Sequence, residues 1–438
     1  MSKLIERVVV NRLSQYLEKS FLLPSHQSAY RRFHSVETAL VHLYNNMLHV
    51  LDTGDVGLLI LLDLSAAFDT VDHNILLETL QTRFGICNSA LQWFTSYLQY
   101  RSFSVSKDDL LSPQFPLFAG VPQGSVLGPK LFLMYSEDIE HVFHDSSISH
   151  HLFADDTQLL LHCRPNELPT TLNAAEGVLV NVQSWCSSKR LQLNADKTEA
   201  LLFGTASKVG NSLLSDVSFH LGNASISPSS HVRDLGAHFD SSLNMKHHIS
   251  KIASTCFFHL RRLKSIRPKI DVTSAKSLVS ALIFSRLDYC NSLLAGLPDS
   301  SLLPLQRVLN AAARFVCQLK PFDHTSQAIM DLHWLPIRQR IEFKLCLLVH
   351  KSLNDRAPEY LKNLLTPLSS LRDGRSLRSA THGDLFVPRT RLKSADRAFQ
   401  VYGPQAWNRL PIEIRKVTNE KQFKKQLKTY LYKRAYSL

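Results

Sequence analysis

The chain has 438 residues, of which 44% are hydrophobic and 20% charged, a composition that indicates a folded protein and excludes a disordered one. This length predicts roughly two to four domains. No apolar run approaches the ~20 residues that cross a bilayer, and the charged start lacks the apolar stretch of a signal peptide. We therefore expect an intracellular protein that is not secreted and has no membrane partner. Seven scattered cysteines without a CxxC pair argue against a disulfide framework and a cysteine-type zinc site.

The net charge of +13 is distributed unevenly along the chain. Residues 1–200 carry 14 Lys/Arg and 21 Asp/Glu, a net charge of −7, whereas residues 201–438 carry 36 and 16, a net charge of +20. A strongly basic half collects phosphates and therefore suits a polyanionic partner. On charge alone, solvated surface lysines and arginines are the alternative explanation.

Apolar spacing and turn residues predict the elements of the first half of the chain. The chain opens with helices that are interrupted at residues 23–26, and a buried strand follows over 57–64. The further elements expected before residue 204 are helices over 73–100 with a turn at 84–86, strand-like alternation and a loop over 101–120, a helix over 126–143, a hairpin over 148–163, a helix over 170–190 and a strand pair at 191–193 and 200–203.

The second half of the chain has a different pattern. Residues 204–230 are rich in Ser, Gly and Asn and predict loops with a short strand near Phe219, followed by one strand over 232–239. From 244 to about 360 the apolar spacing predicts helices almost throughout, and residues 361–438 carry 17 Lys/Arg against 5 Asp/Glu. This order predicts an α+β fold with helices on one face of a small antiparallel sheet.

Two acidic sites stand where a core role is not expected. Asp63 ends one apolar run, Asp155-Asp156 end another, and a loop containing Gln123-Gly124 lies between them in the chain. If the strand ends meet, three carboxylates face one point, where they repel one another without a cation. Hard divalent ions prefer oxygen ligands, and two such ions clamp an in-line nucleotidyl displacement, so the residues predict a nucleotidyl transferase. The alternative for an isolated Asp is a helix cap or a turn.

An ordered series of motifs resembles the reverse transcriptases of the non-LTR (LINE-type, jockey-like) retrotransposon family. The motifs are Gln27 to Ser35 in the fingers, Asp63 to Asp69 and Phe153-Ala154-Asp155-Asp156 in the palm, Gly120 to Pro129 beside the nascent base pair, Leu193 to Glu199 with a lysine, and Asp234 to Asp240 in the primer grip. A lone Asp-Asp pair is a weak signal, but the ordered series is a specific one. The similarity continues through Tyr402 to Asn408 and so covers essentially the whole chain.

The resemblance implies a right-hand polymerase fold. Partial fingers and the palm would occupy 1–243, a helical thumb 244–360, and a basic C-terminal region 361–438. The implied activity is that of an RNA-directed DNA polymerase, a nucleotidyltransferase that adds dNTPs to a DNA primer on an RNA template. Two Mg²⁺ ions would be the cofactors, with Mn²⁺ as a substitute, and a DNA target would be a further partner.

The resemblance also implies metal ligands and a catalytic lysine. Asp63, Asp155 and Asp156 would hold the metal ions, and the backbone carbonyl of Leu64 would add an oxygen. Lys197 would contact the triphosphate and protonate the pyrophosphate leaving group. On local sequence alone, an ordinary surface lysine is the alternative for Lys197.

Four further residues would bind the substrate by resemblance. Arg31 would contact the triphosphate, and Gln123 and Gly124 would position the dNTP and the template base. The ring of Phe68 would lie under the sugar and exclude a 2′-hydroxyl; an ordinary core Phe is the alternative. A plain turn before a helix is the alternative for Gln123-Gly124, and Asp69 would pair with a neighbouring basic side chain.

The chain departs from the family pattern in three respects. Lys130 stands where an apolar residue is usual, and Ser136-Glu137-Asp138 replace a more common Ile-Asn-Asp. The chain begins within the fingers and carries no endonuclease segment, so we expect a polymerase with incomplete fingers and without an endonuclease.

Histidines and the basic tail leave two questions. Because no cysteine stands at ligand spacing from them, we expect no structural zinc at the histidines His141, His144, His150, His151, His247 and His248. In the tail, the helix over 423–431 either binds RNA through phosphate contacts and stacking, or is a solvated basic face with a docked apolar stripe.

Two alternatives to the polymerase remain open. One is a truncated, catalytically inactive remnant that binds RNA or DNA through its basic C-terminal half. The other is a group II intron maturase or a telomerase-like polymerase, although the region after residue 244 is more typical of the LINE type. We expect the protein in the nucleus or in a cytoplasmic ribonucleoprotein, and the sequence does not define its oligomeric state.

Overall fold

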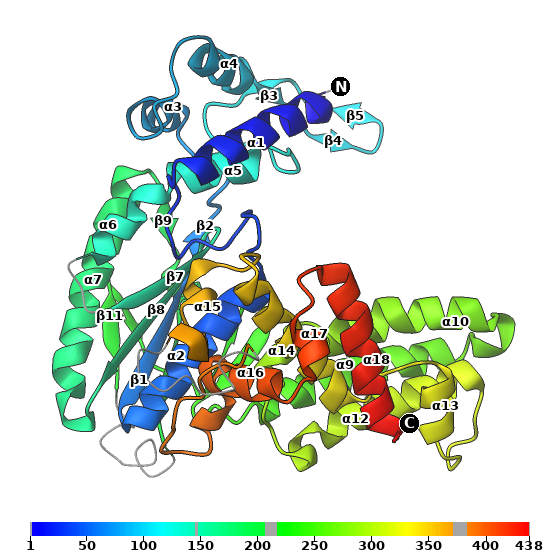
Figure 1. Ribbon diagram of the computed structural model, residues 1–438. Coiled ribbons are helices and arrows are strands. Elements are labelled where there is room, and N and C mark those ends of the chain that lie inside the picture. The colour runs from blue at the N-terminus through cyan, green and yellow to red at the C-terminus, as the bar shows by residue number, and fades with distance from the viewer. Residues whose placement is uncertain (1, 145–147, 206–216, 371–382, 438) are drawn as a thin grey trace. The chain divides into compact units, whose positions relative to one another are not determined.

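The computed structural model describes residues 2–144, 148–205, 217–370 and 383–437 (Figure 1). The chain forms two compact units that do not follow chain order. The first comprises Met1–Arg32, Leu58–Leu202 and Gly210–Ser229, and the second Phe33–Gly57, Phe203–Val209 and Ser230–Leu438. The three-domain division at residues 243 and 360 stays a prediction.

A four-stranded sheet lies in the first unit, with the strand order β10-β1-β8-β7. Its strands are β1 (Val56–Leu62), β7 (Ser149–Phe153), β8 (Asp156–Cys163) and β10 (Glu199–Phe203). Six of the seven residues of β1 are buried, which explains why its sequence is a continuous aliphatic run. Strands β7 and β8 form the predicted antiparallel hairpin, with Phe153 opposite Asp156. The fold is therefore a mixture of helix and sheet, as expected.

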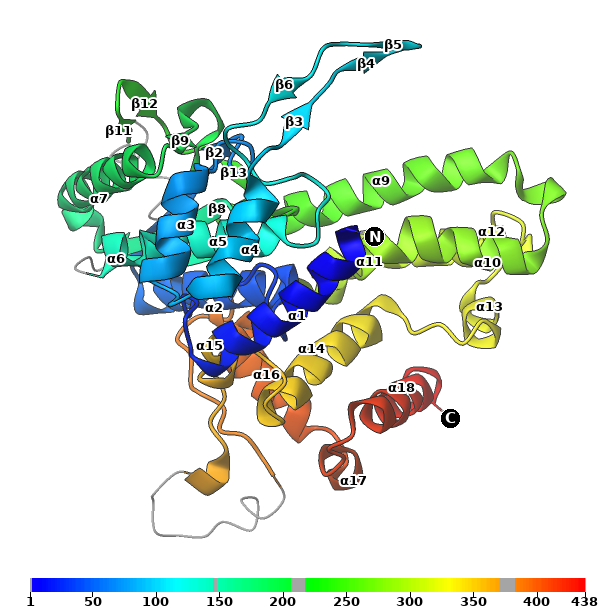
Figure 2. The same ribbon diagram turned by 90° about the horizontal axis from the view of Figure 1, so that it is seen from above.

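The first unit also contains helices and small ribbons. The helices are α1 (Ser2–Lys19), α3 (His73–Thr82), α4 (Asn88–Leu98), α5 (Gly128–Tyr135), α6 (Glu140–Phe143) and α7 (Leu168–Ser188). Helix α7 packs on β8 and on β11 (Phe219–Leu221), which pairs with β12 (Ala224–Ile226). Figure 2 shows β3 (Ser102–Phe103) and β6 (Phe115–Pro116) leading into a projecting ribbon tipped by β4 (Ser106–Lys107) and β5 (Leu110–Leu111).

The second unit is mainly helical, as predicted for residues after 244. Its helices are α2 (Val36–Thr53), α9 (Lys246–Lys264), α10 (Val272–Val279), α11 (Ser285–Leu287), α12 (Asp299–Cys317), α13 (Ser326–Asp331), α14 (Ile337–Leu353), α15 (Glu359–Lys362), α16 (Phe399–Asn408), α17 (Ile412–Arg415) and α18 (Glu420–Tyr436). Helices α9 and α12 lie side by side, and α14 packs against α16 and α18. Among the described residues, no helix is both long and apolar enough to cross a bilayer.

Three expected elements were wrong in detail. The helix over 126–143 is interrupted, because α5 ends at Tyr135 and a 3-10 turn over Glu137–Ile139 precedes α6. The strand pair does not pair with itself: β9 (Gln192–Leu193) pairs with β2 (Leu64–Ser65), and β10 joins β1. The single strand over 232–239 is a hairpin of β13 (His231–Asp234) and β14 (Ala237–Asp240), because Gly236 takes a φ of +87° in the turn.

The basic tail helix α18 docks through an apolar stripe. Phe423, Leu427 and Leu431 recur at helical spacing and are fully buried, while Lys425 and Lys428 on the same helix are exposed. The stripe supports the second of the two interpretations of this helix. Part of the tail, residues 371–382, lies outside the described residues.

Close packing at Gly57 yields a testable prediction. A Cβ at this position of β1 would lie 2.1 Å from Cζ of the fully buried Phe203 in β10. Gly57→Ala should therefore lower the free energy of unfolding by about 2 kcal/mol, measured by denaturant or thermal unfolding, because an overpacked ring must move.

The control is Gly177→Ala in α7, where an added Cβ meets no atom within 4 Å. This change should stabilise the protein by about 0.5–1 kcal/mol, because alanine favours a helix interior over glycine. Adding Phe203→Leu to Gly57→Ala should restore part of the loss. Equal effects at Gly57 and Gly177 would contradict the packing described here.

Candidate active site

Backbone pairing at the end of β1 fixes the first carboxylate. Asp63 lies between β1 and β2, and its carbonyl accepts a hydrogen bond from the amide of Asn194 at 2.9 Å. The Asn194 side chain in turn accepts from the amide of Lys197 at 3.2 Å and caps the turn that carries this lysine. Lys197 Nζ consequently lies 3.2 Å from Asp63 Oδ2. The structure thus brings together an acid and a base that are far apart in sequence.

The β7–β8 hairpin carries the other two carboxylates at its tip, as predicted. Asp156 begins β8 opposite Phe153, and Ala154 makes the turn with a positive φ of 58°. The buried side chain of Gln27 clamps this turn, because its Oε1 accepts from the Ala154 amide at 3.0 Å and its Nε2 donates to the Ala154 carbonyl at 3.4 Å. Gln27 is a positioning residue for Asp155 that the sequence did not single out.

Burial and neighbouring negative charges raise the pKa values of the hairpin carboxylates. Burial raises the pKa of Asp155, and the charge of Asp63 raises it further, while Lys197 lowers it. Burial, then Asp155 and Asp63, raise the pKa of Asp156 to about 6. The charge of Asp63 therefore acts on both hairpin carboxylates, as expected for carboxylates that lie near one another.

The donor chemistry of this acidic site fits divalent cations. Asp63 Oδ2 is buried without a hydrogen-bond partner, although it forms the ion pair with Lys197. A buried carboxylate oxygen without a hydrogen bond costs free energy, and a bound cation would offset that cost. The carboxylate oxygens of the three aspartates do not all lie within 4.8 Å of one another. Among the described residues, only one other group of His, Cys, Asp or Glu side chains meets that spacing. Without a cation, Lys197 offsets the charge of Asp63. Repulsion among the three carboxylates explains why their oxygens stay this far apart.

The Gln-Gly loop lies against the turn that follows β2. The Asp69 carboxylate accepts two hydrogen bonds from Gln123 Nε2, at 3.0 and 2.9 Å. The expectation that Asp69 pairs with a basic side chain was wrong, because this amide takes its two oxygens. Gly120 has a φ of +89°, and a Cβ there would lie 2.8 Å from the Asp69 carbonyl. Gly124 also has a positive φ, and its surroundings are open.

Phe68 is half-buried, which fits both a core role and a substrate-binding role. Its ring stacks on Phe132 of α5 with centroids 4.7 Å apart, and its carbonyl accepts from the amide of Val121 at 2.9 Å. Leu64, which the sequence predicts to offer a carbonyl oxygen, is buried and pairs with Leu193. The roles of both residues stay predictions.

The loop after α1 is held by cations. Arg31 Nη1 donates to the carbonyl of Gln27 at 3.0 Å and to that of Pro24. Lys130, which departs from the family pattern, is buried in α5 and donates from Nζ to the Tyr30 carbonyl at 2.9 Å. Burial lowers the pKa of Lys130, and burial followed by the charge of Asp155 raises that of Tyr30. Lys130 therefore anchors the loop that carries Arg31, a role that its unusual position in the motif could have signalled.

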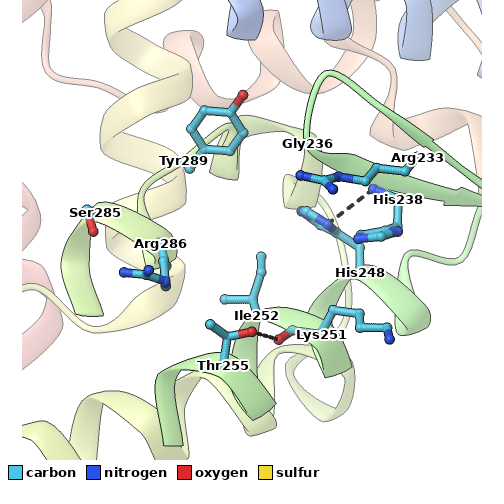
Figure 3. A pocket seen from close by; sticks show the side chains of 10 residues that line it. All are labelled: Arg233, Gly236, His238, His248, Lys251, Ile252, Thr255, Ser285, Arg286 and Tyr289. Atoms are coloured by element: carbon cyan, nitrogen blue, oxygen red, sulfur yellow. Dashed lines mark hydrogen bonds between the residues drawn. The ribbon is translucent and has the colours of Figure 1, made fainter. Parts of the chain in front are cut away.

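A basic cavity of about 440 Å³ lies on the second unit (Figure 3). The residues of interest in its lining are Arg233, His238, His248, Lys251, Arg286 and Tyr289. The Tyr289 hydroxyl donates to the Leu235 carbonyl at 2.6 Å and so fixes the turn of the β13–β14 hairpin. Burial, then the charges of His238 and His247, lowers the pKa of His248 to about 4. Three permanent cations therefore line a cavity at the predicted primer grip.

Residues 1–283, which include all three aspartates, match the family described as reverse transcriptase (RNA-dependent DNA polymerase). The match spans more than half of the chain, and the chain therefore belongs to this family.

Several curated relatives agree with this family. The chain is 27% identical to a probable RNA-directed DNA polymerase from transposon BS of Drosophila melanogaster, over 60% of this chain and 29% of the relative. It is 24% identical to the probable RNA-directed DNA polymerase from transposon X-element of the same species, over 90% of this chain and 42% of the relative. It is 28% identical to the RNA-directed DNA polymerase from the mobile element jockey, also of Drosophila melanogaster, over 46% of this chain and 22% of the relative. The resemblance to the jockey-like non-LTR group is confirmed. The chain spans less than half the length of these relatives.

Similarity to solved structures is lower. Apo telomerase from Candida tropicalis matches with a TM-score of 0.40 and 13% identity, over 75% of this chain and 50% of that chain. Telomerase from the same species in complex with a fragment of telomeric RNA matches with a TM-score of 0.39 and 11% identity, over 75% of this chain and 56% of that chain. Similarity at this level does not bear on the assignment of the site.

The raised pKa of Asp156 predicts how stability depends on pH in metal-free protein. Between its ordinary 3.8 and about 6, folded protein keeps a proton that the unfolded chain releases. The group therefore destabilises the fold progressively as pH rises through this window. Asp156→Asn should leave the free energy of unfolding unchanged at about pH 4 and raise it by on the order of 1 kcal/mol at about pH 8, after allowance for solvent screening.

Chemical unfolding in a chelator at both pH values measures this effect. Asp109→Asn, at an exposed position of the projecting ribbon, is the control and should change stability at neither pH. The same gain at both pH values for Asp156→Asn would show that carboxylate repulsion is not its cause.

The Gln27 clamp predicts a linked loss of stability and activity. Gln27→Leu keeps the volume but leaves the amide of Ala154 without its acceptor, at a cost of about 1–3 kcal/mol. The turn that holds Asp155 then loosens, and the rate of dNTP incorporation should fall about 10-fold or more, since misplaced catalytic groups lose orientation.

Thermal unfolding and single-turnover incorporation measure the two effects. Gln99→Leu, at an exposed position after α4, is the matched control and should change neither quantity by more than the error. If Gln27→Leu is as stable and as active as the wild type, Gln27 does not position the turn that holds Asp155.

Proposed function

We propose that the chain is the polymerase part of a non-LTR retrotransposon reverse transcriptase, which extends a DNA primer with dNTPs on an RNA template. The observation that carries the proposal is the gathering of Asp155 and Asp156 near Asp63: after burial, the charge of Asp63 raises the pKa of both hairpin carboxylates. Membership of the reverse transcriptase family supports it. An RNA- or DNA-binding remnant without activity is less favoured, because Lys197 lies 3.2 Å from Asp63 and its charge also acts on Asp155.

Divalent cations are the cofactors of this proposal. Asp63, Asp155 and Asp156 would hold two Mg²⁺ ions, or Mn²⁺, with the Leu64 carbonyl as a further oxygen ligand. When bound, such ions polarise the phosphate and favour the attacking form of the primer 3′-hydroxyl. Lys197 lies 3.2 Å from Asp63 and would be released toward the triphosphate as cations take its place. It then protonates the pyrophosphate leaving group.

Substrate selection would fall to the loop and to Phe68. Gln123 and Gly124 would position the dNTP and the template base, since the open surroundings and positive φ of Gly124 allow close approach. Phe68 would lie under the sugar, with its ring held by Phe132, and exclude a 2′-hydroxyl. Arg31 would contact the triphosphate, and its bonds to the carbonyls of its own loop orient it.

Nucleic acid would bind to both units. The cations of the cavity at Arg233, Lys251 and Arg286 suit a primer phosphate, and the net charge of +20 over residues 201–438 suits the RNA template and a DNA target. In the right-hand description, residues 1–243 would form the fingers and palm, and 244–360 a thumb. We also propose that the protein acts in the nucleus or in a cytoplasmic ribonucleoprotein.

Primer extension tests the activity directly. With an oligonucleotide-primed RNA, dNTPs and Mg²⁺, the chain should extend the primer, and Asp155→Asn should reduce the rate by about 10³-fold or more, because a metal ligand supplies several kcal/mol. Asp109→Asn, at an exposed position, should keep the full rate. If folded wild-type protein binds the primed RNA but extends nothing, the binding remnant replaces the polymerase.

A further inference from the structure

Three metal-ligating side chains meet in the first unit, outside the acidic site. Glu140 Oε1 lies 3.8 Å from His26 Nδ1 and 3.9 Å from His150 Nε2. All three ligand atoms lie within 4.8 Å of one another, which is true of no other trio of His, Cys, Asp or Glu among the described residues. The proposed polymerase activity uses none of these residues.

The backbone holds this cluster in place. The loop after α1 pairs with β7, since the Leu152 amide donates to the His26 carbonyl at 3.0 Å and the Ser28 amide donates to the Leu152 carbonyl at 2.9 Å. This pairing sets the His26 ring beside that of His150, with centroids 5.3 Å apart. The third member, Glu140, begins the helix α6. The cluster is therefore built from three separate segments of one unit.

Packing also fixes the orientation of the ligands. The ring of Phe143, on the same helix as Glu140, stacks on His150 with centroids 4.5 Å apart. The His150 side chain is 13% exposed, and its Nε2 is buried without a hydrogen-bond partner among the described residues. A buried imidazole nitrogen without a partner is costly unless something else binds it.

The distances themselves suit a metal ion. At 3.8 and 3.9 Å the nitrogens are too far from Glu140 Oε1 for hydrogen bonds, which span about 2.7–3.2 Å. A tetrahedral ion about 2.0–2.1 Å from each ligand would set ligand atoms about 3.4 Å apart, about half an ångström closer than each nitrogen lies to Glu140 Oε1. Ser25 Oγ lies 3.1 Å from His26 Nδ1 and 3.4 Å from Glu140 Oε1, where a fourth oxygen ligand would sit.

The ligand types select the ion. Two imidazoles with one carboxylate form a donor set that Zn²⁺ accepts, whereas Mg²⁺ prefers oxygen ligands alone. The acidic site at Asp63 and the His-Glu cluster thus differ in the cation that they favour.

We propose that His26, Glu140 and His150 bind one Zn²⁺ ion, with Ser25 Oγ or a water molecule as the fourth ligand. The ion ties the loop that carries Arg31 to β7 and α6. Its role is structural and is independent of nucleotide addition. The spacing of histidines in the sequence did not predict this site, because His26 and Glu140 lie 114 positions apart and belong to no zinc motif.

Zinc binding to the purified chain tests the proposal. Metal-stripped protein is titrated with Zn²⁺ against a chromophoric chelator in excess Mg²⁺, which occupies the acidic site. The wild type should bind one equivalent tightly, and His150→Ala and Glu140→Gln should each weaken binding about 100-fold or more, beyond the 10–100-fold typical of outer-shell changes. Zn²⁺ should also raise the Tm of the wild type but of neither variant.

The matched control is His220→Ala. His220 lies 3.0 Å from Glu176 in an exposed His-Glu pair that lacks a second histidine, so its loss should leave tight Zn²⁺ binding unchanged. Co²⁺ in place of Zn²⁺ should give the visible absorption of a tetrahedral site in the wild type and in His220→Ala.

The proposal is overturned if the wild type binds no Zn²⁺ under these conditions, or if His150→Ala and Glu140→Gln bind it as tightly as the wild type does. Glu140→Gln is close in shape to the native side chain, so it reports on the site even if His150→Ala does not fold. Primer extension by the same protein separates the outcomes, because loss of zinc binding leaves the polymerase proposal untouched.

Discussion

Repulsion among three carboxylates is the constraint around which the first unit is organised. Asp63 follows a fully paired strand and Asp155 and Asp156 sit at a hairpin tip, so backbone hydrogen bonds, not the side chains, hold them near one another. Burial first, and then the neighbouring negative charges, raise the pKa values of the two hairpin carboxylates. A site that is destabilising alone and stabilised by cations is what a metal-dependent nucleotidyl transfer requires.

Neutral and basic side chains hold the frame around the acids. Gln27 clamps the hairpin turn, Asn194 sets the turn that presents Lys197, and Lys130 anchors the loop after α1. Each makes hydrogen bonds to backbone groups, which fix position without adding negative charge to the site. The His26–Glu140–His150 cluster would add a further tie to the same loop. The loop that carries Arg31 is therefore fixed at several points.

The sequence predicted local elements well and long-range pairing poorly. The strand before Asp63, the Asp155-Asp156 hairpin and the helices after residue 244 follow from apolar period and turn residues, which are local. The pairing of β9 with β2 was missed, because nothing local in Gln192-Leu193 indicates which strand is its partner. Phe33–Gly57 belongs to the second unit for the same reason, since chain order does not reveal tertiary neighbours.

Within the candidate site, residue types were easier to predict than their supports. Asp63, Asp155 and Asp156 stood out because charges at the ends of apolar strands have no core role. The supporting roles of Gln27 and Lys130 were not predicted, because a buried polar side chain is recognised by its partner, and the partners are backbone groups more than 90 residues away. Asp69 was expected to pair with a basic side chain, whereas the Gln123 amide donates to both of its carboxylate oxygens.

Counting the ions at the acidic site tests most directly whether Asp63, Asp155 and Asp156 hold two divalent cations. Mn²⁺ binding would be followed by electron paramagnetic resonance in protein bound to a chain-terminated primer on RNA with the next dNTP, in a His150→Ala background that removes the histidine cluster. If the three aspartates hold the metal ions, the protein should bind two Mn²⁺ ions per molecule beyond those bound by dNTP and nucleic acid alone. Both ions should be lost when Asp155→Asn and Asp156→Asn are added. The same number of ions with and without these two substitutions would contradict it.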